Sequence, residues 1–422
     1  MKKYIIYSVL FTALLTTGCE DRITEIFTGN SPVYMSYEDL RQTIKQTDAR
    51  ELVNPGKLYF KDNYIFIVET MKGIHIIDNA DPTNPENISF IEILGIADIA
   101  VKGTILYTDS YVDLVAMDIS DLTDIYEVGR VEDMLPYTIP EFDENFPVAM
   151  IDEEQGVVVD WEIKKIKQQI ENRNYPVYRG GWEVMTDVGG GKVSGGGISA
   201  GGVGVGGSMA RFGIAENTLY AIDNTTLHIF SISDPEEPVF KKDFSAGWGI
   251  ETLFILDKHM FLGSQNGMRV FDISVPNSPM YVSDFWHATG CDPVVVQGDL
   301  AYITLRGGNA CGNELNQLIV VSIRNIAEPE ELKAYPMEGP YGLGIDDKTL
   351  FVCDGEAGLK VFDVTNPLNI TDKQLAIFPD IFGYDVIPFD GVLMLIGEDG
   401  LYQYDYSDVT NISLLSKIEV GD

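Results

Sequence analysis

A six-residue phrase that recurs along this chain constrains its fold more than any other feature. Gly358-Leu-Lys-Val-Phe-Asp363 shows its form, in which a run of mostly apolar residues ends in Asp or Ser. Seven copies are found, ending at Asp78, Asp118, Ser231, Asp272, Ser322, Asp363 and Asp405. Successive copies are 40, 113, 41, 50, 41 and 42 residues apart. A period near 41 residues, interrupted by two insertions, predicts a repeat architecture.

Each repeat unit contains four short apolar segments joined by turns, and unit six shows the pattern best. Strands are expected at 341–345, 349–353, 359–364 and 374–378, separated by segments rich in Asp, Asn, Gly and Pro, which favour turns. Four short antiparallel strands in one period are typical of a β-propeller blade. The sequence therefore predicts an all-β, seven-bladed β-propeller of four-stranded antiparallel blades over residues 56–422.

The third strand of each unit is apolar on both faces, as a blade packed between two neighbours requires. Two positions in the phrase, on opposite faces of the strand, are apolar in every unit. They are Ile74, Leu114, Leu227, Met268, Leu318, Leu359 and Leu401, and Ile77, Met117, Phe230, Phe271, Val321, Phe362 and Tyr404. A third position holds His75, His228, Arg269, Lys360 or Tyr402 in different units, which predicts partial exposure and no shared chemistry.

This third strand resembles the repeat of the LVIVD-repeat family. Leu114-Val-Ala-Met-Asp118 and Leu318-Ile-Val-Val-Ser322 stand close to the family pattern. The resemblance covers about residues 56–420, apart from the large insertion. It implies a propeller on an exported bacterial protein and implies little about activity.

The N-terminus has the features of an export signal. Lys2 and Lys3 precede an apolar run at 4–15, which is too short to span a bilayer, since a spanning helix needs about 20 residues. Residues 1–18 are therefore expected to be a signal peptide. Gly18-Cys19 resembles the lipobox of bacterial lipoproteins, although Thr16 stands where Leu is usual. The resemblance implies that Cys19 is lipidated and anchors the protein in the outer membrane, and that residues 19–55 form a tether and N-terminal segment. Glu20-Asp21 resembles the acidic tether of lipoproteins that are sent to the cell surface, which implies a surface location. The alternative is an ordinary secretory signal with a chance cysteine.

Two insertions interrupt the repeat, and both are expected on the same face of the disc. The larger, 136–211, follows the fourth strand of unit two, and it contains a Gly-rich loop at 189–208 that is expected to be a lid or a slack linker. The smaller lies within 306–316 of unit five. Cys291 and Cys311 fall on this face in one blade, which predicts a disulfide; free thiols or a metal site are the alternatives. Cys353 is expected to be buried.

Composition disfavours one function class and leaves several open. A net charge of −36 disfavours nucleic-acid binding, because an acidic surface repels phosphate. Trp248, Trp286 and His287 fall on the insertion-bearing face, where they could bind a protein or a glycan, or simply pack between blades. Asp292 and Asp385 open first strands near the channel mouth. There they could bind Ca²⁺ or carry raised pKa values, or be separate solvated acids.

The sequence contains no nucleophile elbow, metalloprotease motif, P-loop or EF-hand loop. The leading hypothesis is a surface-anchored lipoprotein that binds a protein or glycan partner without catalysis and without a cofactor. The rival is an extracellular hydrolase or lyase with Asp292, Asp385 and His287 at its centre. A purely structural role is a third possibility.

Overall fold

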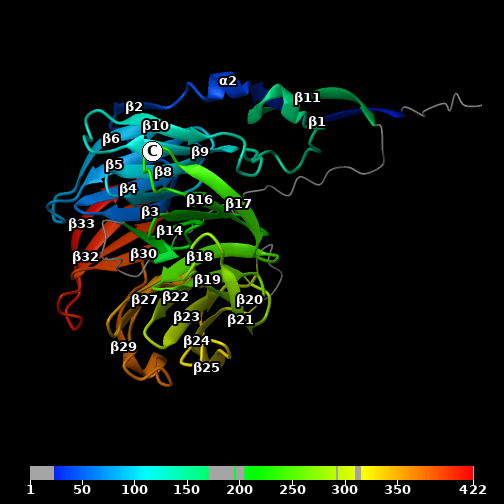
Figure 1. The fold of residues 1–422 in the computed structure, drawn as a ribbon. Coiled ribbons are helices and arrows are strands. Elements are labelled where there is room, and N and C mark those ends of the chain that lie inside the picture. The colour runs from blue at the N-terminus through cyan, green and yellow to red at the C-terminus, as the bar shows by residue number, and fades with distance from the viewer. Residues whose placement is uncertain (1–22, 171–193, 196–203, 291–292, 309–314, 422) are drawn as a thin grey trace, which may run out of the picture.

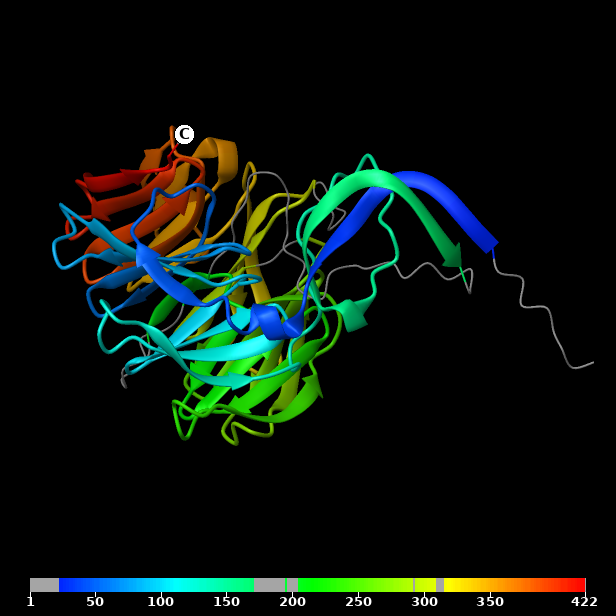
Figure 2. The same ribbon diagram turned by 90° about the horizontal axis from the view of Figure 1, so that it is seen from above.

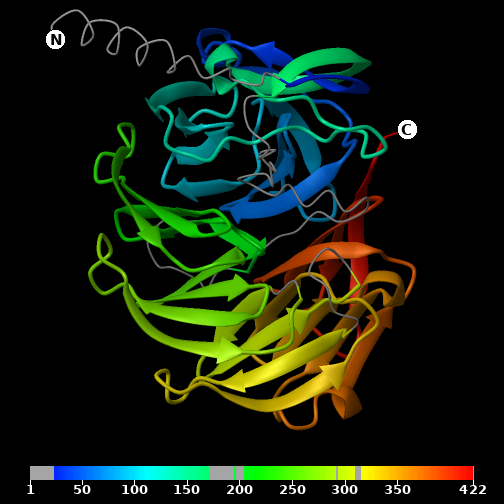
Figure 3. The same cartoon turned by 90° about the vertical axis from the view of Figure 1, so that its right-hand side faces the viewer.

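The computed structural model describes residues 23–170, 194–195, 204–290, 293–308 and 315–421. Seven four-stranded antiparallel sheets follow one another around a ring, seen face-on in Figure 3, so the predicted seven-bladed propeller is confirmed. Within the described residues the helical segments are short: α2 (Tyr37–Leu40) and the 3-10 turns Glu153–Gln155, Gly355–Ala357 and Thr371–Lys373.

Each blade consists of four strands that are consecutive in the chain, ordered from the channel outward. Blade one has β3 (Pro55–Lys61), β4 (Tyr64–Glu69), β5 (Gly73–Asp78) and β6 (Glu86–Glu92), and blade two has β7 (Ile99–Lys102), β8 (Ile105–Ser110), β9 (Asp113–Asp118) and β10 (Tyr126–Val131). Blade three has β14 (Phe212–Ala215), β15 (Thr218–Ile222), β16 (Thr226–Ser231) and β17 (Val239–Ser245), and blade four has β18 (Ile250–Leu256), β19 (His259–Ser264), β20 (Gly267–Asp272) and β21 (Met280–Trp286). Blade five has β22 (Val294–Gln297), β23 (Leu300–Leu305), β24 (Gln317–Ser322) and β25 (Glu330–Pro336). Blade six has β26 (Leu343–Asp346), β27 (Thr349–Cys353), β28 (Leu359–Asp363) and β29 (Gln374–Phe378), and blade seven has β30 (Gly383–Phe389), β31 (Val392–Gly397), β32 (Gly400–Asp405) and β33 (Ser413–Glu419).

The ring closes by packing blade seven against blade one, without a strand exchanged across the seam. A buried apolar cluster joins the two blades, with Leu58 and Ile65 on one side and Ile387 and Leu401 on the other. Polar bonds add specificity, because Gln403 Nε2 donates to Asn79 Oδ1 at 2.7 Å. Blade one therefore covers the apolar face that blade seven would otherwise expose to water.

The repeated phrase forms the third strand of every blade, and its two apolar positions are buried on both sides of the sheet, as predicted. Several copies of the phrase begin with glycine because a side chain there would clash with the neighbouring strand. A Cβ at Gly73, Gly267, Gly358 or Gly400 would lie 2.0–2.2 Å from a carbonyl oxygen of the neighbouring fourth strand. The backbone there also has positive φ, which glycine adopts without strain.

The Asp residues that follow the third strands are turn formers, as expected. In the turns of blades one and two, Asp81 and Asp121 each accept hydrogen bonds from the backbone N–H and the hydroxyl of the Thr two residues later. Such side-chain bonds replace backbone bonds that a tight turn cannot make.

Segments outside the repeat extend or leave the ring. β2 (Lys45–Asp48) pairs with β6 at the rim of blade one. β1 (Ile23–Met35), in the expected tether, pairs with β11 (Val157–Ile170) of the large insertion to form a two-stranded arm that projects from the ring (Figures 1 and 2). The described parts of the Gly-rich stretch are strands and not loop. β12 (Ser194–Gly195) pairs with β13 (Val205–Ser208), and β13 pairs with β3.

Replacing Gly358 by Ala should destabilise the propeller by about 3 kcal/mol or more, because the new Cβ would lie 2.0 Å from the Phe378 carbonyl oxygen at a φ of +85°. Gly103→Ala is the matched control, since its φ is +59° but nothing lies within 4 Å; it should cost about 1 kcal/mol. Urea unfolding measures both. Equal losses would show that backbone angle alone, and not the close approach of two strands, selects the glycine.

Candidate functional site

The hairpin β12–β13 lies in the central channel, with Ser208 near the start of β30 and Val205 near the end of β3. β13 runs beside β3, β26 and β30, while β12 contacts β18, β22, β26 and β30, all inner strands of their blades. Gly204, just before β13, fits against Tyr59, because a Cβ there would lie 2.3 Å from the ring. Small residues therefore let the insertion enter a space bounded by inner strands.

Asp385, predicted at the channel mouth, is fully buried and holds this hairpin. Its Oδ1 accepts a bond from Ser208 Oγ at 2.8 Å, and its Oδ2 accepts one from Ser208 N at 3.1 Å. Ser208 Oγ in turn accepts the N–H of Leu343 at 2.8 Å. Burial raises the pKa of Asp385 well above its ordinary value, although the bonds from Ser208 oppose the rise. Asp385 therefore tethers the insertion and is not open to solvent.

A second buried carboxylate, Asp98, holds the chain where it leaves the channel. Its Oδ2 accepts bonds from Lys57 Nζ at 2.9 Å and from Phe212 N at 3.1 Å. Asp109 lies behind it and accepts the N–H groups of Ala97 and Asp98, both at 2.9 Å. Burial, with the charge of Asp98, raises the pKa of Asp109 to about 7. Acids just before β7 and in β8 thus bind backbone N–H groups beside the channel.

The aromatic residues predicted on this face are exposed. Trp248 is 55% exposed in the connection between blades three and four, and Trp286 is 60% exposed at the end of β21. Arg269 lies between these two connections: its Nη1 donates to Ala246 O at 3.0 Å, and its guanidinium carbon is 6.0 Å from the Trp286 ring centroid. We call Trp248, Arg269 and Trp286 the Trp–Arg patch.

His287 is half-buried beside this patch. Its Nδ1 lies 2.6 Å from the carbonyl oxygen of Ala288, and its ring packs near Phe285. Asp292, Cys291, Cys311 and Cys19 lie outside the described residues, so the predicted disulfide and lipidation remain predictions. Cys353 is buried, as expected, and burial raises the pKa of its thiol.

The partial exposure predicted for His75 and His228 is wrong, since both are buried. Each histidine is paired with a carboxylate: His75 Nε2 lies 3.1 Å from Glu69 Oε2, and His228 Nδ1 lies 2.8 Å from Asp243 Oδ1. Burial disfavours the charged His228, but its two carboxylate neighbours outweigh that effect and raise its pKa. These carboxylates satisfy the ring nitrogens of buried histidines: His228 also lies 3.3 Å from Asp223 Oδ2 through its Nε2.

Described residues line cavities at two places in the propeller. One, of about 220 Å³, lies at the opposite mouth of the channel, where Val205 meets Phe254, Val296, Ile345 and Phe389. It is mainly apolar, with Asp346 at its wall.

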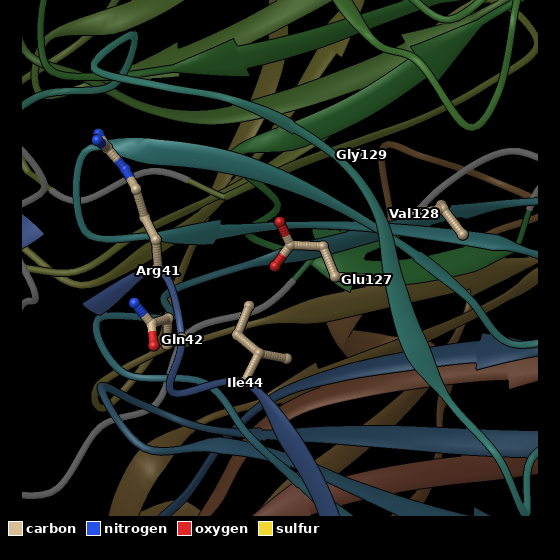
Figure 4. A pocket seen from close by; sticks show the side chains of 6 residues that line it. All are labelled: Arg41, Gln42, Ile44, Glu127, Val128 and Gly129. Carbon is tan, nitrogen blue, oxygen red and sulfur yellow. The ribbon is translucent and has the colours of Figure 1, made fainter. Parts of the chain in front are cut away.

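The other cavity, of about 350 Å³, lies between β10 and the segment after α2; Figure 4 shows Glu127 extending toward Arg41, Gln42 and Ile44. Its charged residues already have partners, because Arg41 binds Asp113 at 2.8 Å and Glu127 binds Arg130 at 2.6 Å.

Among the described residues, no group of three His, Cys, Asp or Glu side chains could hold a metal ion. Ca²⁺ binding by Asp292 and Asp385 therefore stays a prediction. The described part of the chain contains no helix with the length and apolar character needed to cross a membrane.

The fold and this face define a seven-bladed propeller whose channel receives a hairpin from its own insertion. The family model for the LVIVD repeat matches residues 57–90 and 96–133, which are blades one and two, so the chain carries LVIVD repeats. No curated protein matches the sequence.

Solved propellers are similar in fold. The periplasmic gluconolactonase PpgL of Pseudomonas aeruginosa is 9% identical with a TM-score of 0.52, covering 87% of this chain and 97% of that one. Kluyveromyces lactis Hsv2 is 10% identical with a TM-score of 0.48, covering 86% and 97%. Moraxella catarrhalis BamB is 8% identical with a TM-score of 0.45, covering 85% and 96%. At 9% identity the likeness to PpgL shows the fold alone.

Sequence reasoning missed Ser208 and Arg269 as parts of this face. Ser208 stood at the end of a glycine run, and its partner Asp385 is 177 residues away. Arg269 occupies the variable repeat position that also holds His, Lys and Tyr. The sequence signal that could have identified Arg269 is its position between the two connections that carry Trp248 and Trp286.

Asp109→Asn should remove a pH dependence of stability between about pH 4 and pH 7. The folded protein keeps this proton up to about pH 7, whereas an unfolded Asp loses it near 4, so the wild type loses up to about 1.4 kcal/mol per pH unit as pH rises through this window. Urea unfolding at several pH values gives the difference between wild type and variant. Asp121→Asn, whose pKa is lowered in the folded state, should leave the slope between pH 5 and 7 unchanged; equal slopes in the wild type and Asp109→Asn would contradict the assignment.

Proposed function

We propose that this protein is a lipid-anchored recognition module of the outer membrane that binds a protein or glycan partner through the Trp–Arg patch. The carrying observation is that Trp248 and Trp286 expose more than half of their surface on either side of Arg269. Trp and Arg are the residue types that contribute most binding energy at protein interfaces. An indole face also stacks on the apolar face of a sugar ring.

The patch is positioned by rigid structure. Trp286 is the last residue of β21 and pairs with Gly267 of β20. The two strands approach closely there, because a Cβ at Gly267 would lie 2.2 Å from the Phe285 carbonyl oxygen. Gly247 leaves room for the Arg269 guanidinium, because a Cβ there would lie 1.5 Å from Nη1. A partner would therefore meet a surface whose backbone is already ordered, which lowers the entropy cost of binding.

The rival reading, catalysis at the channel mouth, has less support. Asp385 is buried beneath Ser208, which binds both of its carboxylate oxygens. A substrate would have to displace the hairpin to reach this acid. The proposal therefore places recognition on the outer part of the face, beside His287, and invokes no cofactor.

The double variant Trp248→Ala and Trp286→Ala should weaken binding at least about tenfold, because each hot-spot aromatic typically contributes about 2 kcal/mol. The measurement is binding of the purified protein to arrays of bacterial surface glycans and to isolated cell envelopes. Tyr126→Ala is the matched control: Tyr126 is 53% exposed at the start of β10, on the other face of the disc. If the double variant and the control retained equal binding to every probe, the patch would have no role in recognition.

A further inference from the structure

The two faces of the β1–β11 arm differ in character. Antiparallel pairing places Ile26 opposite Lys167 and Thr28 opposite Lys165, so these side chains share one face with Thr24 and Ile163. All six side chains are exposed, with Ile26 at 59% and Ile163 at 45%. We call this set, Thr24, Ile26, Thr28, Ile163, Lys165 and Lys167, the Lys–Ile face.

No acidic residue of β1 or β11 belongs to the Lys–Ile face. At the end nearer the ring, Asn30 Nδ2 donates to the Asp143 carbonyl oxygen at 2.9 Å, so the loop with Glu141, Asp143 and Glu144 borders the face there. The opposite face of the same ribbon carries Glu25, Glu162 and Lys164, and Lys164 Nζ binds Glu162 Oε2 at 2.7 Å. The contrast matters because the whole chain has a net charge of −36. An exposed basic and apolar surface on such a chain has a definite electrostatic preference for an anionic partner.

The base of the arm packs against the ring. Leu40, Tyr111 and Val157 form a buried cluster with the loops of blades one and two. Next to it, Arg41 binds the buried Asp113 at 2.8 Å. Burial alone would raise the pKa of Asp113, but its bonds from Arg41, Asp133 N–H and Arg130 outweigh burial and lower it.

We propose that the Lys–Ile face lies on an anionic phospholipid bilayer, with Ile26 and Ile163 in the interface and Lys165 and Lys167 at the headgroups. This inference rests on the lipid anchor of the proposed function. Cys19 lies four residues before the first residue of β1, so its backbone, the attachment point of the acyl groups, would be no more than about 14 Å from the end of the arm. Isoleucines buried in the interface and lysines that extend toward lipid phosphates are the chemistry of a membrane-surface contact.

Charge complementarity selects the bilayer over a protein groove. Lysine stems lie along an apolar surface while their ammonium groups stay in water, which suits a headgroup layer. The end of the arm stands away from the ring in Figures 1 and 2, so contact there does not require the acidic ring to approach the lipid. The proposal concerns this face of the arm alone and leaves the Trp–Arg patch for its own partner.

The test places a tryptophan on either face of the arm in the full, lipidated chain. Ile163→Trp reports on the Lys–Ile face, and Lys164→Trp, one residue away, is the matched control on the opposite face. Each variant is reconstituted into vesicles of phosphatidylglycerol and phosphatidylcholine with brominated acyl chains, which quench nearby indoles. We expect most of the added fluorescence of Ile163→Trp to be lost and that of Lys164→Trp to be retained.

Charge dependence gives the second measurement. Three changes should each restore the quenched fluorescence of Ile163→Trp, because each weakens the attraction between the lysines and the lipid phosphates. They are the added substitutions Lys165→Gln and Lys167→Gln, vesicles of phosphatidylcholine alone, and added salt. Equal quenching on both faces, or none on either, would overturn the proposal. So would binding of a soluble acidic polysaccharide without quenching by lipid, since the face would then recognise a polyanion.

The lipid anchor is tested separately, by comparing how much of the wild type and of Cys19→Ser floats with phosphatidylcholine vesicles. If the wild type floats no better than Cys19→Ser, the lipid anchor of the proposed function falls. Quenching of Ile163→Trp by added anionic vesicles still decides the role of the Lys–Ile face. If the anchor holds and position 163 is not quenched, only the inference about the arm falls.

Discussion

Every blade of this protein is apolar on both faces, and the rest of the structure depends on that constraint. A sheet buried on both sides needs a neighbour on each side, and a line of such sheets would leave two apolar faces in water. Closing seven blades into a ring removes both ends. The seam meets the constraint by side-chain packing, with Gln403 and Asn79 joined across it, and by one backbone bond from Gly421 N–H to the Leu52 carbonyl oxygen at 2.7 Å. Closure without an exchanged strand is therefore sufficient for this chain, because blade seven presents the same apolar phrase as the others.

Buried charge follows a different rule. Asp385 and Asp98 open or precede inner strands, where an acid is costly unless hydrogen bonds replace its water. Each accepts bonds from the segment that returns from the large insertion, Asp385 from Ser208 and Asp98 from Phe212 N–H. These acids fix the path of a Gly-rich segment that has little apolar surface of its own. Their chemistry is therefore used for structure, and the outer loops remain the place for recognition.

The fold followed from the sequence because its signal is local and repeated. The spacing of the phrase gave the number of blades, and the apolar residues on both faces of the third strand gave their packing. The path of the hairpin could not be predicted, since a glycine run has the same composition in a slack loop and in a packed channel. Exposure of Trp248 and Trp286 was left open against packing between blades. The role of Arg269 was missed because the repeat position it occupies varies in chemistry, and only the tertiary structure places it beside Trp286.

Strand pairing also explains how the segments outside the repeat are arranged. Unpaired strand edges tend to recruit other chains, and natural sheets cover them. In blade one, β2 covers the rim edge and β13 covers part of the channel edge. The arm uses the same pairing, but it forms a ribbon of two strands, which has little stability by itself in water. Its base is held by the apolar cluster around Tyr111 and by the Arg41–Asp113 pair, while Ile163 at its middle and Ile26 in its far half stay exposed. Apolar side chains left exposed on a ribbon that is marginal in isolation favour an external surface as their partner, and the lysines among them require that surface to be anionic.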